Sequence, residues 1–142
     1  MYYYLNQTNY PHVAYPTLTD LPELMRADST VRSAGCGLCS ASMVVTNLTG
    51  REFSLIDCLE LSLAVGANHS PGTDMDLLAP YVAERFDLDL VATDDPELLR
   101  EHLKRGGMAV ANVTGRKTAT WACFPTEGTM WLWWGLRRME RP

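Results

Sequence analysis

The stretch SAGCGLCSASMVV, residues 33–45, carries the strongest local pattern in the chain. Glycine and small polar residues lead directly into a segment whose cysteine, serine, methionine and valine side chains recur with helical spacing, and Gly50 is a suitable stop. We therefore predict a helix that begins at Cys36. A thiol at the first position of a helix meets unpaired N–H groups and the positive end of the helix dipole, which favour the thiolate form. Cys36 is thus a candidate nucleophile, and the plain alternative is a small cysteine that packs a helix end.

The rest of the chain predicts helices first and strands later. We expect one helical turn over 20–28, a polar loop over 29–35, and a well-buried helix from Ser54 with Asp57 in a capping box. A further helix is expected over 72–86, kinked or restarted at Pro80, and another over 94–107. The expected strands are 88–93, 108–114 and 120–124. This layout predicts an α+β domain without internal repeats.

Two of these helices carry end signals and an apolar stripe. Thr73 and Asp76 are expected to cap the helix over 72–86. In the helix over 94–107, the expected N-cap is Asp95, Pro96 takes the first position and Gly106 is the stop. Its buried stripe is expected to consist of three leucines: Leu98, Leu99 and Leu103.

Composition restricts the functional class. The 142 residues suit one domain, and 46% hydrophobic with 20% charged residues is ordinary for a soluble protein. The net charge of −5 argues against nucleic-acid binding, which needs a basic face. No apolar run approaches the roughly 20 residues of a membrane span, and no signal peptide is visible. We therefore expect a cytoplasmic protein with free thiols at Cys36, Cys39, Cys58 and Cys123, of which the last two are expected in the core.

The pair Cys36 and Cys39 also permits two other interpretations. A C-x-x-C motif occurs in thiol redox proteins, although these place a buried strand before the motif, and the residues here are polar. Half of a zinc site is the second possibility, but the chain has no further C-x-x-C or H-x-x-H pair to complete four ligands. No metal and no cofactor are expected.

The segment GCGLCSASMVV, residues 35–45, resembles the active-site helix of papain-like cysteine peptidases of the C39-like group. YYLNQTNYP (3–11), GTDMDLLAPYVAERF (72–86) and GGMAVANVTG (106–115) are similar to other segments of that family, so the resemblance covers residues 2–128. It implies a papain-like fold, in which a helical half precedes an antiparallel sheet, and a peptide or protein substrate. It also implies Cys36 as nucleophile and Gln7 as an oxyanion-hole donor. The alternative for Gln7 is an exposed polar residue in a loop.

The chain lacks a histidine at the place where the resembled family carries its catalytic one. Family members carry this residue in a glycine-led, valine-rich strand that follows the segment matching 106–115. The chain has only His12, His69 and His102, none of which lies there. Each is interpreted as a surface residue, and His102 is expected on a charged helix face. Without a base for the thiol proton, and without the Asp or Asn that orients it, turnover should be negligible.

GTMWLWWG, residues 128–135, stands where the histidine strand is expected. Met and Trp each have a single codon. If the coding sequence is read from the third base of codon 128, the codons of Met130–Trp131 and of Trp133–Trp134 therefore necessarily encode valines. With suitable codons for Gly128, Thr129 and Leu132, the shifted frame encodes His-Tyr-Val-Val-Val-Val-Gly. We therefore expect an incomplete peptidase-like domain over 1–128, a sheet that is cut short, and an out-of-frame tail over 129–142. The alternative is a non-catalytic binding module whose tryptophan-rich end is an interfacial anchor.

Overall fold

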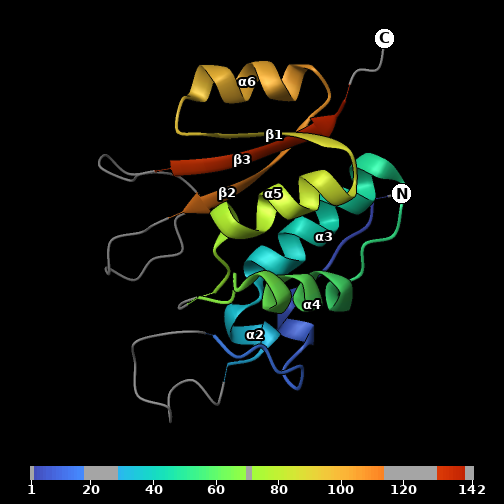
Figure 1. Ribbon diagram of the computed structural model, residues 1–142, viewed down its shortest axis with the longest axis vertical. Helices are drawn as coiled ribbons and strands as arrows, with labels where there is room; N and C mark the ends of the chain where they lie inside the picture. The colour runs from blue at the N-terminus through green and yellow to red at the C-terminus, as the bar shows by residue number, and fades with distance from the viewer. Residues whose placement is uncertain (1, 18–28, 70–71, 114–130, 140–142) are drawn as a thin grey trace.

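The computed structural model describes residues 2–17, 29–69, 72–113 and 131–139. A three-stranded antiparallel sheet lies between two helical layers (Figure 1). One face of the sheet packs against α3 (Cys36–Thr49) and α5 (Met75–Arg85), and α6 (Pro96–Lys104) covers the other face. The expected mixed α+β class is therefore confirmed.

The sheet contains β1 (Leu88–Thr93), β2 (Met108–Val113) and β3 (Trp131–Arg138) in the order β1-β3-β2. The strand that comes last in sequence is thus central, and it pairs with both neighbours. Because side chains alternate along a strand, Trp134 and Leu136 share one face and Gly135 lies on the other. Both apolar side chains are buried, 4% and 1% exposed respectively.

β3 lies within the segment 129–142, which is expected as an out-of-frame tail, and it forms the middle of the sheet. Arg137 forms an ion pair with Asp89 of β1 at 2.8 Å, and Arg138 Nε donates to the carbonyl of Leu48 at 2.6 Å. These contacts tie β3 to a strand and to the end of α3. They do not bear on how the segment is encoded, so the frameshift stays a prediction for the coding DNA.

Upstream of α3 lie η1 (Gln7–Asn9) and α2 (Val31–Ala34), which pack against each other. The expectation of a polar loop over 29–35 is therefore wrong for residues 31–34, which form α2. The N–H of Thr30 donates to Ser33 Oγ at 2.9 Å, which starts a short helix that apolar periodicity could not reveal. Gly35 is at once the end of α2 and the N-cap of α3. A Cβ there would lie 2.5 Å from the Val31 carbonyl, so only glycine permits this junction.

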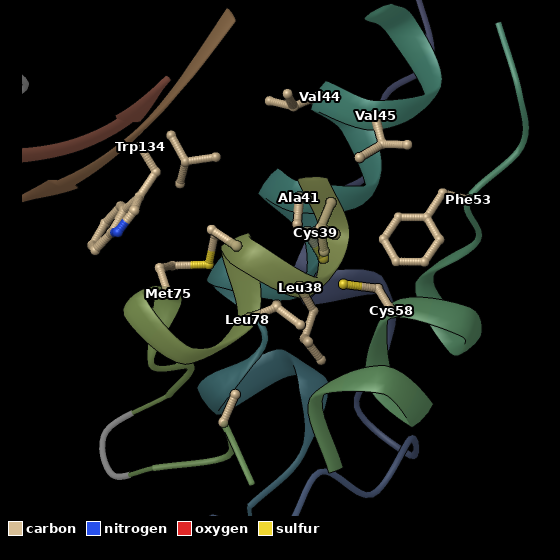
Figure 2. Packing of buried hydrophobic residues seen from close by; sticks show 14 of the residues in the cluster. Leu38, Cys39, Ala41, Val44, Val45, Phe53, Cys58, Met75, Leu78 and Trp134 are labelled. Atoms are coloured by element: carbon tan, nitrogen blue, oxygen red, sulfur yellow. The ribbon is translucent and has the colours of Figure 1, made fainter. Parts of the chain in front are cut away.

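The main core lies between α3, α5 and α4 (Leu55–Val65). Leu38, Val45, Phe53 and Cys58 contribute fully buried side chains to it (Figure 2). Cys39 is also buried, and its sulfur lies in the same interior. Cys58 is thus a core thiol, as expected, and Cys39 is an interior thiol as well. Cys123, like the turn over 20–28 and the strand over 120–124, falls outside the described residues.

The capping box at the start of α4 is confirmed, because Asp57 N donates to Ser54 Oγ at 3.0 Å and Ser54 N to Asp57 Oδ2 at 3.2 Å. The expectation that this helix is well buried is wrong. Ile56 and Leu63 are 48% and 39% exposed, because α4 packs on α3 and α5 along one side only.

The start of α5 also differs from the expectation. Its N-cap is Asp74, whose carboxylate accepts from the N–H groups of Asp76 and Leu77 at 3.0 and 3.3 Å. Thr73 and Asp76 are therefore not the capping residues, and the hydroxyl of Thr73 is available for another contact. The helix continues through Pro80 to Arg85 without a restart.

The ends of α6 follow the expectation, and its buried face does not. Asp95 caps it, Pro96 opens it, and Gly106 adopts φ +80° just beyond its end. Leu98 and Leu103 are each 46% exposed and Leu99 is half-buried, whereas His102 is only 5% exposed. The predicted leucine stripe and the surface position of His102 are thus both wrong. A Cβ at Gly135 would lie 2.8 Å from the His102 ring, so the imidazole fills the hollow that this glycine leaves in the sheet.

Candidate functional site

The candidate site is built around the first residue of α3. Cys36 is exposed and lines a pocket of about 340 Å³ where α3 meets the sheet. The pocket is formed by four parts of the chain, which contribute Cys36, Gly37 and Ser40; Gly72, Thr73 and Met75; Val110, Ala111 and Asn112; and Trp134. The volume is at the small end of the range for ligand pockets, and suits a group of one or two amino-acid residues.

Apolar side chains form the inner part of this pocket. Met75, Val110 and Trp134 are at most 7% exposed, and the indole of Trp134 lies near Met75 in Figure 2. Trp134 Nε1 donates to Asp76 Oδ1 at 2.9 Å, which fixes the ring between β3 and the start of α5. No charged side chain lines the pocket within the described part of the chain. Such a site favours a neutral ligand, because a buried charge without a partner is costly.

Two glycines let the segment before α5 approach the start of α3. A Cβ at Gly37 would lie 2.8 Å from Thr73 Cβ and 3.2 Å from Thr73 Oγ1. A Cβ at Gly72 would lie 3.1 Å from the carbonyl oxygen of Ala34. The glycine after Cys36 is therefore needed for Thr73 to lie against the first turn of α3.

Thr73 is held by a buried tyrosine. The hydroxyl of Tyr15, a fully buried residue, shares hydrogen bonds with Thr73 Oγ1 at 2.8 Å and with Ser62 Oγ at 2.7 Å. Burial raises the pKa of Tyr15, and the nearby Cys58 and Cys36 add to this effect. Tyr15 is therefore a neutral hydrogen-bonding group at ordinary pH.

The interior thiols differ from Cys36 in their surroundings. Burial raises the pKa of Cys39 to about 11, with a further contribution from the charge of Cys36. Burial also raises the pKa of Cys58 to about 12. Cys36, Cys39 and Cys58 are free thiols. Among these three, Cys36 alone combines exposure with a position in the pocket, which fits it best for the nucleophilic role.

Gln7 does not line the pocket. Its Nε2 donates to the carbonyl oxygen of Arg32 at 2.8 Å, which joins η1 to α2. This bond uses one of the two amide hydrogens. Gln7 therefore helps to place the segment that leads to Cys36, and its expected role as oxyanion donor stays a prediction.

None of the three histidines lines the pocket. His12 and His69 are exposed, as expected. His102 lies on the α6 side of the sheet, and its Nε2 has no hydrogen-bond partner among the described residues. Since β3 separates it from the layer that holds α3, His102 cannot act as a base for Cys36 in this fold.

The sequence did not indicate a place in the site for three pocket residues: Thr73, Asn112 and Trp134. Its patterns predict a helix cap at Thr73, a strand residue at Asn112 and part of a tail at Trp134. The paired glycines at 37 and 72 were the available signal, because close backbone approach requires residues without a Cβ.

No group of three or more His, Cys, Asp or Glu side chains among the described residues could hold a metal ion. No described helix combines the length and the apolar character needed to cross a bilayer. Comparison of the chain with protein-family models, with curated proteins and with solved structures gave no match.

Proposed function

We propose that this chain is a cysteine-peptidase-like protein whose Cys36 accepts an acyl group from a peptide-like ligand. The observation that carries the proposal is the exposed thiol at the first position of α3, in a pocket with an apolar interior and no charged lining among the described residues. The resemblance of residues 35–45 to the active-site helix of C39-like peptidases supports it. So does the arrangement of a helical layer against an antiparallel sheet, which is compatible with a papain-like fold.

In this reaction the Cys36 thiol first loses its proton to solvent, and the resulting thiolate attacks the carbonyl carbon of the ligand. A C–S bond forms, the carbonyl oxygen takes the negative charge, and the collapse of this intermediate expels the leaving group. An amide leaving group must be protonated, which requires an acid that the pocket lacks among its described residues. An activated ester needs no such acid. We therefore expect acylation by activated esters and negligible hydrolysis of peptides.

The test is a burst experiment with N-acetyl-alanine p-nitrophenyl ester. We expect one equivalent of p-nitrophenolate per chain, a mass increase of one acyl group at Cys36, and almost no further release. Cys36→Ser should abolish the burst. Cys39→Ser changes a buried thiol on the same helix and should leave the burst intact if the chain remains folded.

Two results would count against the proposal. The nucleophile would be wrong if the burst persisted in Cys36→Ser. The claim of negligible turnover would be wrong if the wild-type chain released many equivalents of p-nitrophenolate, because that requires a base that deacylates Cys36. Sequencing of the coding DNA around codon 128 separately tests whether a histidine strand lies in another frame.

A thiol redox role is the second candidate, and one observation favours it. Cys36 and Cys39 lie three positions apart on α3, a spacing that places two side chains next to each other on a helix. An exposed attacking thiol beside a buried one suits reversible disulfide formation. Equilibration in glutathione buffers decides between the candidates. A loss of two mass units that reverses with the buffer ratio supports the redox role, whereas mixed disulfide at Cys36 alone supports the acyl-transfer role.

A further inference from the structure

Three hydroxyl groups form a buried chain that ends at the pocket. Ser62 Oγ lies 2.7 Å from the Tyr15 hydroxyl, and this hydroxyl lies 2.8 Å from Thr73 Oγ1. Ser62 and Tyr15 are both fully buried, whereas Thr73 is half-buried and lines the pocket. This series of hydroxyl groups thus runs from α4 through the interior to Thr73, in the pocket that Cys36 also lines.

The direction of the hydrogen bonds among these three hydroxyl groups follows from the partners that each one has. Among the described residues, Tyr15 is the hydrogen-bond partner of Ser62 Oγ. A buried hydroxyl that leaves its hydrogen unpaired loses about 1–3 kcal/mol, so Ser62 donates to Tyr15. Tyr15 has a single hydrogen, and with Ser62 already a donor it donates to Thr73. The hydrogen of Thr73 is then directed away from Tyr15, and the pocket offers the space for an acceptor.

Thr73 also lies at a suitable place for catalysis. Its Oγ1 is 3.2 Å from the point that a Gly37 Cβ would occupy, directly after the nucleophile in sequence. Gln7, in contrast, does not line the pocket and already donates to Arg32. The Thr73 hydroxyl, which lines the pocket beside Gly37, is therefore better placed than this amide to meet a ligand.

We infer that the Thr73 hydroxyl donates a hydrogen bond to the carbonyl oxygen of the acyl group that Cys36 attacks, and that Tyr15 and Ser62 orient it. This inference rests on the proposed acyl transfer at Cys36. The bond strengthens as negative charge develops on the oxygen, which lowers the barrier to acylation. Thr73 is then a catalytic residue, and Tyr15 is a positioning residue.

The test compares two reactions of Cys36 in the full chain. N-acetyl-alanine p-nitrophenyl ester forms an oxyanion on attack, whereas methyl methanethiosulfonate transfers a methylthio group to sulfur and contains no carbonyl. Thr73→Val, which keeps the shape and removes the hydroxyl, should slow acylation about 10- to 100-fold and leave the methylthiolation rate within twofold. Thr73→Ser should restore most of the acylation rate. Tyr15→Phe should slow acylation by a smaller factor, again without an effect on methylthiolation.

Thr46→Val is the matched control. Thr46 Oγ1 accepts a hydrogen bond from Phe53 N at 3.2 Å, is half-buried like Thr73, and does not line the pocket. We expect both rates to stay within twofold of wild type. Equal slowing of the two reactions in Thr73→Val, or equal acylation rates in Thr73→Val and wild type, would overturn the role of Thr73.

Failure of the proposed function has a different signature. If the wild-type chain reacts with the ester no faster than N-acetylcysteine does, the pocket contributes nothing to acyl transfer and both proposals fall. If the wild type is faster and Thr73→Val is equally fast, the inference about Thr73 alone is overturned.

Discussion

The two faces of the sheet are built differently. The face toward α3 and α5 receives the buried side chains of Trp134 and Leu136, and the Cys36 pocket opens beside it. The opposite face has a single amphipathic helix, α6, which places one imidazole against Gly135 and leaves leucines in solvent. The chain therefore has its candidate nucleophile, Cys36, and a buried histidine on opposite sides of β3. A residue type that suits catalysis does not make a catalytic group unless the fold places it within reach.

The energetic difference between the faces follows from burial. Large apolar side chains removed from water contribute about 1.5–3 kcal/mol each, so the inner face should dominate stability. The outer face has a polar ring in its most buried position, with Nε2 unpaired among the described residues. Four predictions test this contrast.

Trp134→Ala should have the largest effect, a loss of about 3–5 kcal/mol in the free energy of unfolding. The substitution leaves a cavity between β3 and α5 and removes the hydrogen bond to Asp76. Urea unfolding followed by circular dichroism measures the loss. Leu98→Ala on the outer helix is the control, with a change of less than about 1 kcal/mol because the side chain is half exposed. The contrast breaks down if the two variants lose equal stability.

Alkaline pH should weaken the helical layer through Cys58. Burial raises the pKa of this thiol from 9.0 to about 12, so the folded chain keeps the proton over a range in which the unfolded chain has lost it. The corresponding stability is fully present below pH 9 and is lost as the pH rises toward 12. At about 1.4 kcal/mol per pKa unit, it amounts to at most about 4 kcal/mol. Urea unfolding of wild type and Cys58→Ala between pH 8 and roughly 11 should give a flatter profile for the variant, and parallel profiles would refute the assignment.

His102→Leu should leave the outer face intact or stabilise the chain by about 1 kcal/mol. Nε2 of this buried ring is unpaired among the described residues, so replacement by an apolar side chain removes a desolvation penalty. The midpoint of thermal unfolding at neutral pH reports the change. His69→Leu, at an exposed position, serves as the matched control. A loss of more than about 2 kcal/mol in His102→Leu would mean that the imidazole makes a stabilising hydrogen bond.

Leu103→Lys should have the smallest effect, within about 0.5 kcal/mol of wild type in urea unfolding. The leucine is 46% exposed on α6, so a long polar side chain can extend into water from the same position. A large loss would show that this leucine is buried and that the stripe predicted from its spacing is correct.

The sequence predicted the features that depend on neighbouring residues. The start of α3 at Cys36, the capping box of Ser54 and Asp57, the ends of α6, and the bounds of β1 all follow from local signals, because caps and turns act over three or four residues. Trp134 was not predictable in the same way. Its strand pairs with β1 and β2 from positions 18 or more residues upstream, and no local rule reports such pairing.

The residues of the candidate site likewise divide into those that local signals predict and those that long-range contacts place. Cys36 was predictable because its chemistry depends on the first turn of its own helix. Thr73 was misread as a cap, since a threonine before a helix satisfies the capping rule equally well. Its actual partner, Tyr15, lies 58 residues away in sequence.

By itself, the sequence determined the class of the fold, the position of the candidate nucleophile at the start of a helix, and the lack of a histidine in the strand where the resembled family carries one. Only the tertiary structure decided which side of the sheet each group occupies: His102 behind β3, Trp134 and Thr73 at the pocket. The physical reason is that helix ends and thiol placement are governed by local hydrogen bonds, whereas burial depends on the shape of the surface that a side chain meets. In this chain, Gly37, Gly72 and Gly135 provide that shape by the absence of a side chain.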